Sequence, residues 1–164
     1  MNRGFILVSR WSLHAPVDAV WELLRKPEEW PEWWPYLRAV SLLHPGGDED
    51  LGARRRFVWG SLLGYGLTFD ITTTRVLRHR ELEGNADGDV NGIGTWRLAP
   101  RAVATEVNYR WQVELGKRWM RLAAPLLAPV FAWNHHGVMR AGARGMASRL
   151  GCRLEGYAAV DAAR

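Results

Sequence analysis

Apolar and polar side chains alternate from near the start of the chain. Every second residue from Phe5 to Leu13 is apolar except Ser9, so these side chains share one side of an extended backbone. A period of two over nine residues is typical of a strand with one buried face. The pattern therefore predicts a first strand over residues 5–13.

The spacing of the apolar residues changes to three and four after this strand. Pro16 suits the first turn of a helix, where its missing N–H costs nothing, and apolar residues then follow at helical spacing up to Leu24. Pro27 ends this helix. Residues 28–35 predict a second short helical segment, which is bounded by prolines and contains three tryptophans.

The middle of the chain consists of short apolar runs separated by glycine, proline and acidic turns. Such punctuation predicts six strands, at residues 37–43, 53–59, 67–78, 80–83, 94–99 and 103–115. Four glycines in residues 84–94 predict a turn there. Strands joined by short turns form an antiparallel meander, and residues 5–13 can join it as a seventh strand.

The last part of the chain has a helical composition. After Gly116 the alternation stops, and good helix formers predict one long helix from Pro125 or Pro129 to Leu150, with Gly151 as its stop. A seven-stranded open sheet curls, and only this helix is long enough to cover its concave face. We therefore expect an α+β fold, in which a curved antiparallel sheet wraps around a long C-terminal helix.

In four features the sequence resembles members of the START-like (SRPBCC) superfamily, which includes bacterial polyketide cyclase/dehydrase proteins and plant Bet v 1 allergens. These features are the helix start His14–Trp21, the tryptophan and proline segment Trp30–Pro35, the Gly94–Trp96 run, and the long terminal helix. The resemblance covers roughly the whole chain. It implies the helix-grip fold and one ligand-binding domain over residues 1–164. Members bind sterols, lipids, polyketides or plant hormones, and only some are catalysts.

The composition indicates the cellular location of the protein. Cys152 is the only cysteine, so no intrachain disulfide can form, and the N-terminal residues read as a strand and not as a signal peptide. The longest apolar stretch, residues 122–133, is too short and too rich in proline to span a bilayer. These observations predict a cytoplasmic protein.

The net charge of +5 raises the question of an acidic partner. The arginines are scattered over every segment, and the only tight cluster is Arg54–Arg56. No aromatic and basic signature of a nucleic-acid-binding module accompanies the charge, so we expect no nucleic-acid partner. Transient contact with an anionic membrane remains open.

Aromatic residues are the candidates for the lining of a binding site. The chain has ten tryptophans, and an indole is large and has an N–H that needs a partner. The strand alternation and the helix spacing place a set of side chains between the sheet and the helix; together with Trp34 they form the predicted ligand site: Trp34, Phe57, Phe69, Trp96, Tyr109, Trp111, Phe131, Asn134, His135 and Val138. The alternative is that these residues pack directly on the helix without a cavity.

Polar groups in this set could orient a ligand or act on it. Asn134 lies on the apolar helix stripe and must find a hydrogen-bond partner. His135 could donate a hydrogen bond or carry a proton at the pocket edge, or it could be an ordinary surface histidine. Tyr109 and His135 are the candidate catalytic residues. Arg54 or Arg56 could join them, depending on which strand face points inward; the alternative is that both are ordinary exposed arginines of a strand.

No cofactor or metal site is predicted. His135 and His136 are adjacent on a helix and point about 100° apart, which excludes a same-face metal pair. The glycine patterns match neither a dinucleotide fingerprint nor a phosphate loop, and no nucleophile elbow is present.

Three functions fit these observations. The first is binding, with possible transport, of a small hydrophobic ligand of lipid, sterol or polyketide type. The second is a polyketide cyclase or dehydratase that uses Tyr109 and His135 in general acid–base chemistry. The third is a lipid-transfer module that docks on anionic membranes through its charge and the apolar residues 122–133.

Overall fold

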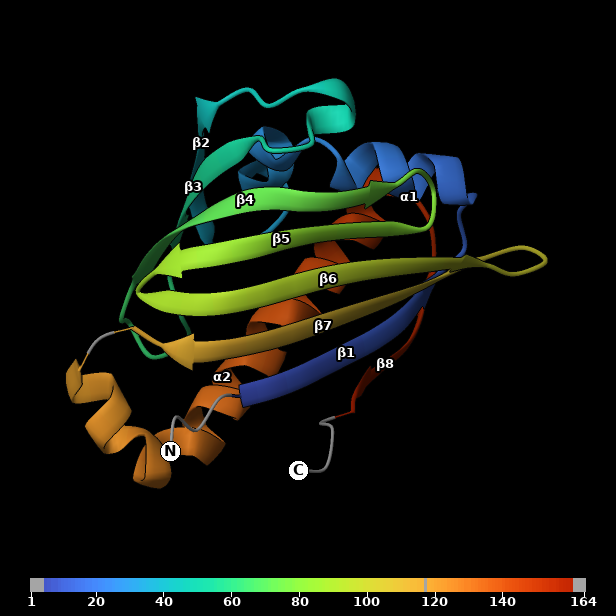
Figure 1. Cartoon of the computed structure of the whole chain (residues 1–164). Coiled ribbons are helices and arrows are strands. Elements are labelled where there is room, and N and C mark those ends of the chain that lie inside the picture. Colours follow the sequence, from blue (N-terminus) through green and yellow to red (C-terminus); the bar gives the residue numbers. More distant parts are fainter. Residues whose placement is uncertain (1–4, 117, 161–164) are drawn as a thin grey trace.

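The sheet dominates the molecule. The computed structural model describes residues 5–116 and 118–160, which contain an eight-stranded antiparallel sheet with the order β2-β3-β4-β5-β6-β7-β1-β8 (Figure 1). Its strands are β1 (Phe5–Leu13), β2 (Leu37–His44), β3 (Arg54–Trp59), β4 (Leu67–Leu77), β5 (Glu81–Gly88), β6 (Val90–Pro100), β7 (Thr105–Leu115) and β8 (Leu154–Ala159).

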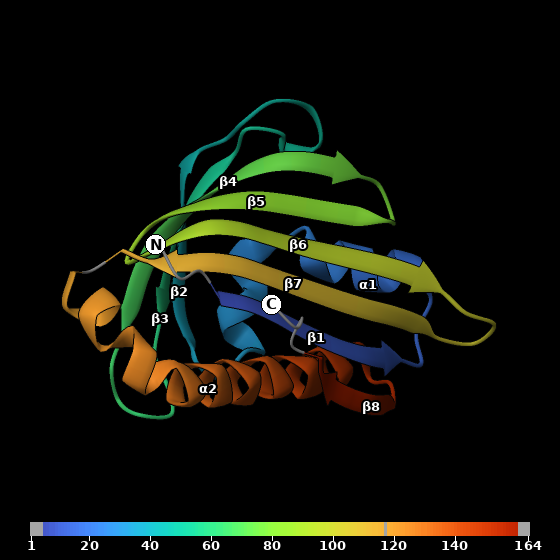
Figure 2. The same ribbon diagram turned by 60° about the horizontal axis from the view of Figure 1, so that its bottom comes forward.

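Helices cover the concave side of this sheet. The short helix α1 (Val17–Leu24) and the 3₁₀ helix η1 (Pro27–Glu32) follow β1, and a second 3₁₀ turn, η2 (Asp48–Asp50), precedes β3. The long helix α2 (Arg118–Leu150) runs beneath the curved sheet (Figure 2). The α+β helix-grip architecture predicted from the sequence is confirmed.

Two details of the strands differ from the prediction. An eighth strand, β8, pairs with β1 at the edge of the sheet. The turn predicted within residues 84–94 is present at Asp89, but it is tighter than expected, because β5 continues to Gly88 and β6 begins at Val90. Gly84 and Gly94 face each other across these two strands. A side chain at Gly94 would collide with the Tyr109 hydroxyl and the Trp111 ring, so this glycine leaves room for aromatic packing and does not form a turn.

The long helix begins earlier than predicted. It starts at Arg118 and continues through Pro125 and Pro129, although proline removes a helical hydrogen bond. The first turns of α2 run at an angle to the remainder in both views (Figures 1 and 2), which is the bend that proline in a helix produces. Across the described ranges, no helix combines the length and the hydrophobicity that a membrane crossing requires.

The tryptophan segment packs tightly against α2. The indole N–H of Trp34 donates a 2.8 Å hydrogen bond to the carbonyl of Val138. A methyl group at Gly142 would overlap the Trp34 indole, and one at Gly145 would overlap the Trp33 carbonyl. These two glycines allow the helix backbone to approach the segment directly, which fixes one end of the space between sheet and helix.

The arginine cluster on β3 divides between the two faces of the sheet. Arg54 and Arg56 both form ion pairs with Asp70 of β4 on the outer face, at 2.8 and 2.7 Å. The hydrogen bond from Arg56, helped by Arg54, holds the pKa of the Asp70 carboxyl below its usual value. Arg54 and Arg56 are therefore exposed strand arginines, and the alternative that one of them enters the pocket is excluded. The intervening residue, Arg55, points inward and is buried.

Candidate functional site

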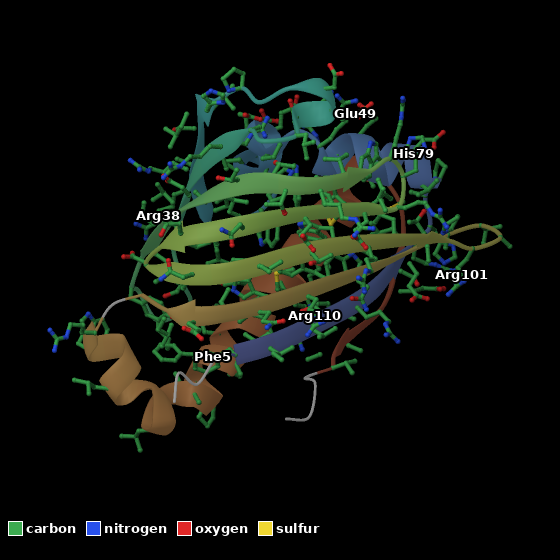
Figure 3. All side chains as sticks on the ribbon, viewed as in Figure 1. Phe5, Arg38, Glu49, His79, Arg101 and Arg110 are labelled. Atoms are coloured by element: carbon green, nitrogen blue, oxygen red, sulfur yellow. The ribbon has the colours of Figure 1, made fainter. Side chains whose placement is uncertain are left out.

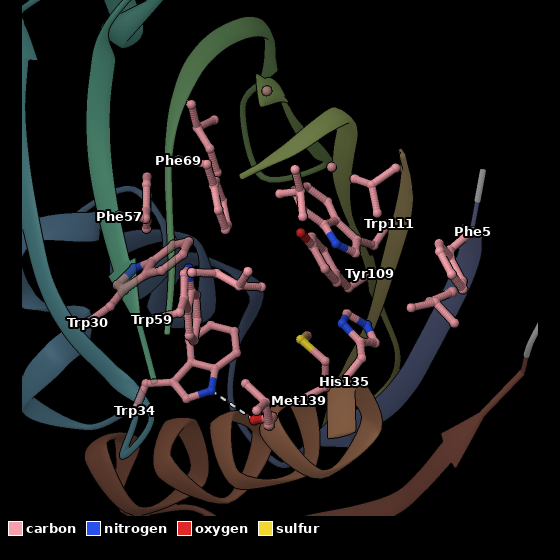
Figure 4. Close-up of a pocket in the computed structure, with 18 of the residues that line it drawn as sticks. Phe5, Trp30, Trp34, Phe57, Trp59, Phe69, Tyr109, Trp111, His135 and Met139 are labelled. Atoms are coloured by element: carbon pink, nitrogen blue, oxygen red, sulfur yellow. Dashed lines mark hydrogen bonds between the residues drawn. The ribbon is translucent and has the colours of Figure 1, made fainter. Parts of the chain in front are cut away.

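A cavity of about 180 Å³ lies between the concave face of the sheet and α2. Figure 4 shows Trp30, Trp34 and Trp59 on one side of it and Tyr109 and His135 on the other. Most of the remaining lining is aliphatic or aromatic, from β1, β3, β4, β6, β7 and α2. Such a mostly apolar hollow with a few polar groups is typical of a small-molecule site.

All ten residues predicted for the ligand site line this cavity: Trp34, Phe57, Phe69, Trp96, Tyr109, Trp111, Phe131, Asn134, His135 and Val138. The structure therefore brings them together around one space. Their contact with a ligand stays a prediction.

Several lining residues were not predicted. Trp59 follows Phe57 at strand spacing, and Phe5 and Leu7 alternate along β1, so the period-two pattern could have identified all three. Trp30 lies in the irregular η1 segment, where no periodicity indicates which way a side chain points.

Stacked aromatic rings form the wall on β6 and β7. The rings of Trp96 and Tyr109 have centroids 4.3 Å apart, and those of Tyr109 and Trp111 are stacked at 6.0 Å. The imidazole of His135 lies nearly parallel to the Tyr109 ring on the same side of the cavity, at 6.5 Å between centroids and 22° between the ring planes. This arrangement offers flat apolar surfaces to a planar ligand.

The two titratable groups of this wall are neutral near pH 7. Burial, with a smaller contribution from His136, lowers the pKa of His135 to about 3. Burial raises the pKa of the Tyr109 phenol well above its usual value. Although His135 as a whole is half-buried, its Nε2 atom is buried and has no hydrogen-bond partner among the described residues. His135 can therefore form a hydrogen bond but is not an imidazolium.

Arg55 reaches the cavity wall from β3, but its charge is already paired. Its Nε donates to Glu28 at 2.7 Å, and its Nη2 donates to Asp50 at 3.1 Å. A guanidinium bound by two carboxylates has little free capacity for an anionic ligand. The cavity thus offers no unpaired cation from the strand that carries the arginine cluster.

The loop between β3 and β4 closes one end of the cavity. The backbone N–H of Leu62 donates to Asn134 Oδ1 at 3.1 Å, and Asn134 Nδ2 donates to the Tyr65 hydroxyl at 3.1 Å. Gly60, Ser61 and Tyr65 of this loop line the cavity. Asn134 has the hydrogen-bond partners that the sequence analysis required, and both belong to the β3–β4 loop. Its side-chain amide therefore holds this loop against α2.

Replacing Asn134 with Ala should loosen the loop. Both hydrogen bonds would be lost, and at about 1 kcal/mol each the loop would open roughly 10- to 30-fold more often. Hydrogen exchange at the Leu62 amide, followed by mass spectrometry, measures this opening. Tyr65→Phe removes only one of the two bonds and should give an intermediate rate. Equal exchange rates in wild type and Asn134→Ala would show that the amide does not hold the loop.

Comparisons with known proteins give a family and a set of similar folds. The family model described as polyketide cyclase / dehydrase and lipid transport matches residues 8–151. No curated protein matches the chain.

Solved structures of low sequence identity share the fold. A START superfamily protein from Mycobacterium smegmatis has a TM-score of 0.74 at 13% identity, covering 90% of this chain and 97% of that one. The Zhui aromatase/cyclase from Streptomyces sp. R1128 has a TM-score of 0.74 at 14% identity, covering 91% and 94%. The ginseng major latex-like protein 151 from Panax ginseng has a TM-score of 0.66 at 10% identity, covering 90% and 97%.

Proposed function

The chain belongs to the polyketide cyclase / dehydrase and lipid transport family, and we propose that it binds an uncharged, ring-containing hydrophobic molecule between the sheet and α2. The observation that carries this proposal is the apolar cavity itself. At about 24 cal/mol per Å³, a space of 180 Å³ that the side chains leave open lowers the packing stabilisation by on the order of 4 kcal/mol. This loss is large compared with the total stability of a globular protein, which is only about 5–15 kcal/mol. The chain has ten tryptophans whose side chains could fill such a space, so a cavity of this size favours a binding site.

The lining suggests the chemical class of the ligand. The volume holds roughly a dozen water-sized spheres, which suits a compact molecule of two or three rings. The stacked wall around Tyr109 favours a planar ring. The Tyr109 hydroxyl and the buried His135 Nε2 favour one or two hydroxyl or carbonyl groups on it, and the paired Arg55 disfavours a negative charge.

Binding accounts for the site better than acid–base catalysis by Tyr109 and His135. An efficient general acid or base has a pKa near the working pH. The pKa of His135 is lowered to about 3 and that of Tyr109 is raised, so neither residue exchanges a proton readily near neutrality. Both residues can still hold a ligand oxygen. A cyclase on this scaffold would have to act mainly by folding its substrate inside the cavity.

Titration with N-phenyl-1-naphthylamine, a neutral apolar fluorophore, tests the proposal. We expect saturable one-to-one binding that quenches the tryptophan fluorescence. At a hundredfold excess over the dissociation constant, the ligand should raise the melting temperature by about 5–10 °C. 1-Naphthoate, a similar ring system with a carboxylate, should bind much more weakly because no unpaired cation lines the cavity among the described residues. If a panel of neutral ring compounds changes neither fluorescence nor melting temperature, the proposal fails.

A further inference from the structure

One face of the first half of α2 exposes large apolar side chains to solvent. Trp119, Leu122, Leu126, Val130 and Trp133 recur at spacings of three and four, which places them in one stripe of the helix. Leu122 and Leu126 are 84% and 83% exposed, and the two tryptophans are about 60% exposed. Scattered exposed leucines are ordinary, but a continuous stripe of five residues marks a contact surface.

A second segment adds to this surface. Leu62 and Leu63 at the tip of the β3–β4 loop are 40% and 50% exposed, and Leu62 lies against Gly137 of α2. Figures 1 and 2 both place this loop beside the bent part of α2, at one end of the molecule. The same loop lines the cavity from its inner side. The apolar surface therefore surrounds the end of the cavity that the loop closes.

The charge around this surface is positive. Residues 115–134, which include the whole stripe, contain no Asp or Glu and three basic residues, Lys117, Arg118 and Arg121. Arg118 is exposed next to the first residue of the stripe. Arg38, also exposed, lies against Gly60 at the start of the loop (Figure 3). Basic residues thus flank both segments of the apolar surface.

We propose that this surface, formed by the α2 stripe together with Leu62 and Leu63, docks on the face of an anionic phospholipid bilayer. Leucine and tryptophan side chains enter the boundary between headgroups and acyl chains, and tryptophan favours this depth because its ring is amphipathic. Flanking arginines are attracted to the lipid phosphates. A neutral protein partner would need no basic rim, so the charge favours the bilayer. The inference goes beyond ligand binding and does not depend on which molecule the cavity takes.

Sedimentation with vesicles tests this docking. Wild-type protein should bind vesicles of phosphatidylcholine and phosphatidylglycerol at least about tenfold more tightly than vesicles of phosphatidylcholine alone, and the difference should shrink in 0.5 M salt. The double variant Leu122→Asp/Leu126→Asp should bind the anionic vesicles about tenfold or more weakly. The control variant Leu42→Asp/Leu51→Asp makes the same charge change at two leucines that are about half exposed, on the edge strand β2 and directly after η2, and should lose much less.

Depth-dependent quenching provides a second measurement. Brominated phospholipids should quench part of the tryptophan fluorescence of wild type, and this part should disappear in Trp119→Phe/Trp133→Phe. Absence of vesicle binding by the folded wild type would overturn the proposal, and so would equal losses in the two leucine variants. Wild type could instead form a concentration-dependent dimer and not bind vesicles. If only Leu122→Asp/Leu126→Asp abolishes that dimer, the surface binds a second copy of the chain and the proposal is wrong. Uptake of N-phenyl-1-naphthylamine without vesicles is measured in the same variants and should be unchanged, which separates this test from that of the cavity.

Discussion

Replacing Gly145 with Ala should destabilise the protein by about 2 kcal/mol, although the same exchange inside a helix usually stabilises it. Alanine gains about 1 kcal/mol of helix propensity over glycine. Against this, the new methyl group would overlap the carbonyl of Trp33, which is backbone and cannot rotate away. A clash with backbone lies at the upper end of overpacking costs, about 3 kcal/mol, so the net loss is about 2 kcal/mol. Urea unfolding followed by tryptophan fluorescence measures the difference.

Gly137→Ala is the matched control, because it places the same methyl group in the same helix. There the new atom meets only the end of the Leu62 side chain, which can move, so the stability should stay close to wild type or increase slightly. If Gly145→Ala is as stable as Gly137→Ala, the close approach of α2 to the tryptophan segment does not hold in solution.

The hydrophobic pattern of the sequence was sufficient to predict most of the architecture. The alternation along β1 and β7 and the long helical composition at the end predicted both the sheet and the helix that covers it. It also predicted which aromatic residues point inward, since strand residues two apart must share a face. Trp96, Tyr109 and Trp111 line the cavity for this reason.

The pattern missed β8, which is held by contacts far apart in sequence. β8 has no buried residue of its own and is fixed by backbone pairing with β1 and by the stacking of Tyr157 on Trp11. The pattern also placed the start of α2 too late, because it took proline in its usual role as a helix boundary.

The roles of polar residues were harder to predict from the sequence, because these roles depend on the residues that they contact in the folded chain. Arg55 points inward from a run of three arginines because Glu28 and Asp50 neutralise it there. Asn134 looked like a ligand-binding group on the helix stripe, yet it holds the β3–β4 loop. No pattern in the sequence links these residues to their partners.

Replacing Val138 with Trp should abolish binding of N-phenyl-1-naphthylamine, with an affinity loss of about a hundredfold or more. Val138 projects from α2 into the cavity. An indole there would occupy a large share of the 180 Å³, and a ligand that must share this space loses both its apolar contacts and its fit. The melting temperature should stay near that of the wild type or rise, because the added ring fills a void and creates little strain.

The control places the same ring on the outer face of the same helix. Val130 is 39% exposed and belongs to the exposed stripe, so Val130→Trp should leave probe binding unchanged. Together the two variants separate filling of the cavity from a general effect of an extra tryptophan on α2. If Val138→Trp is folded and still binds the probe with wild-type affinity, the probe binds elsewhere, and the space between the sheet and α2 is not the ligand site.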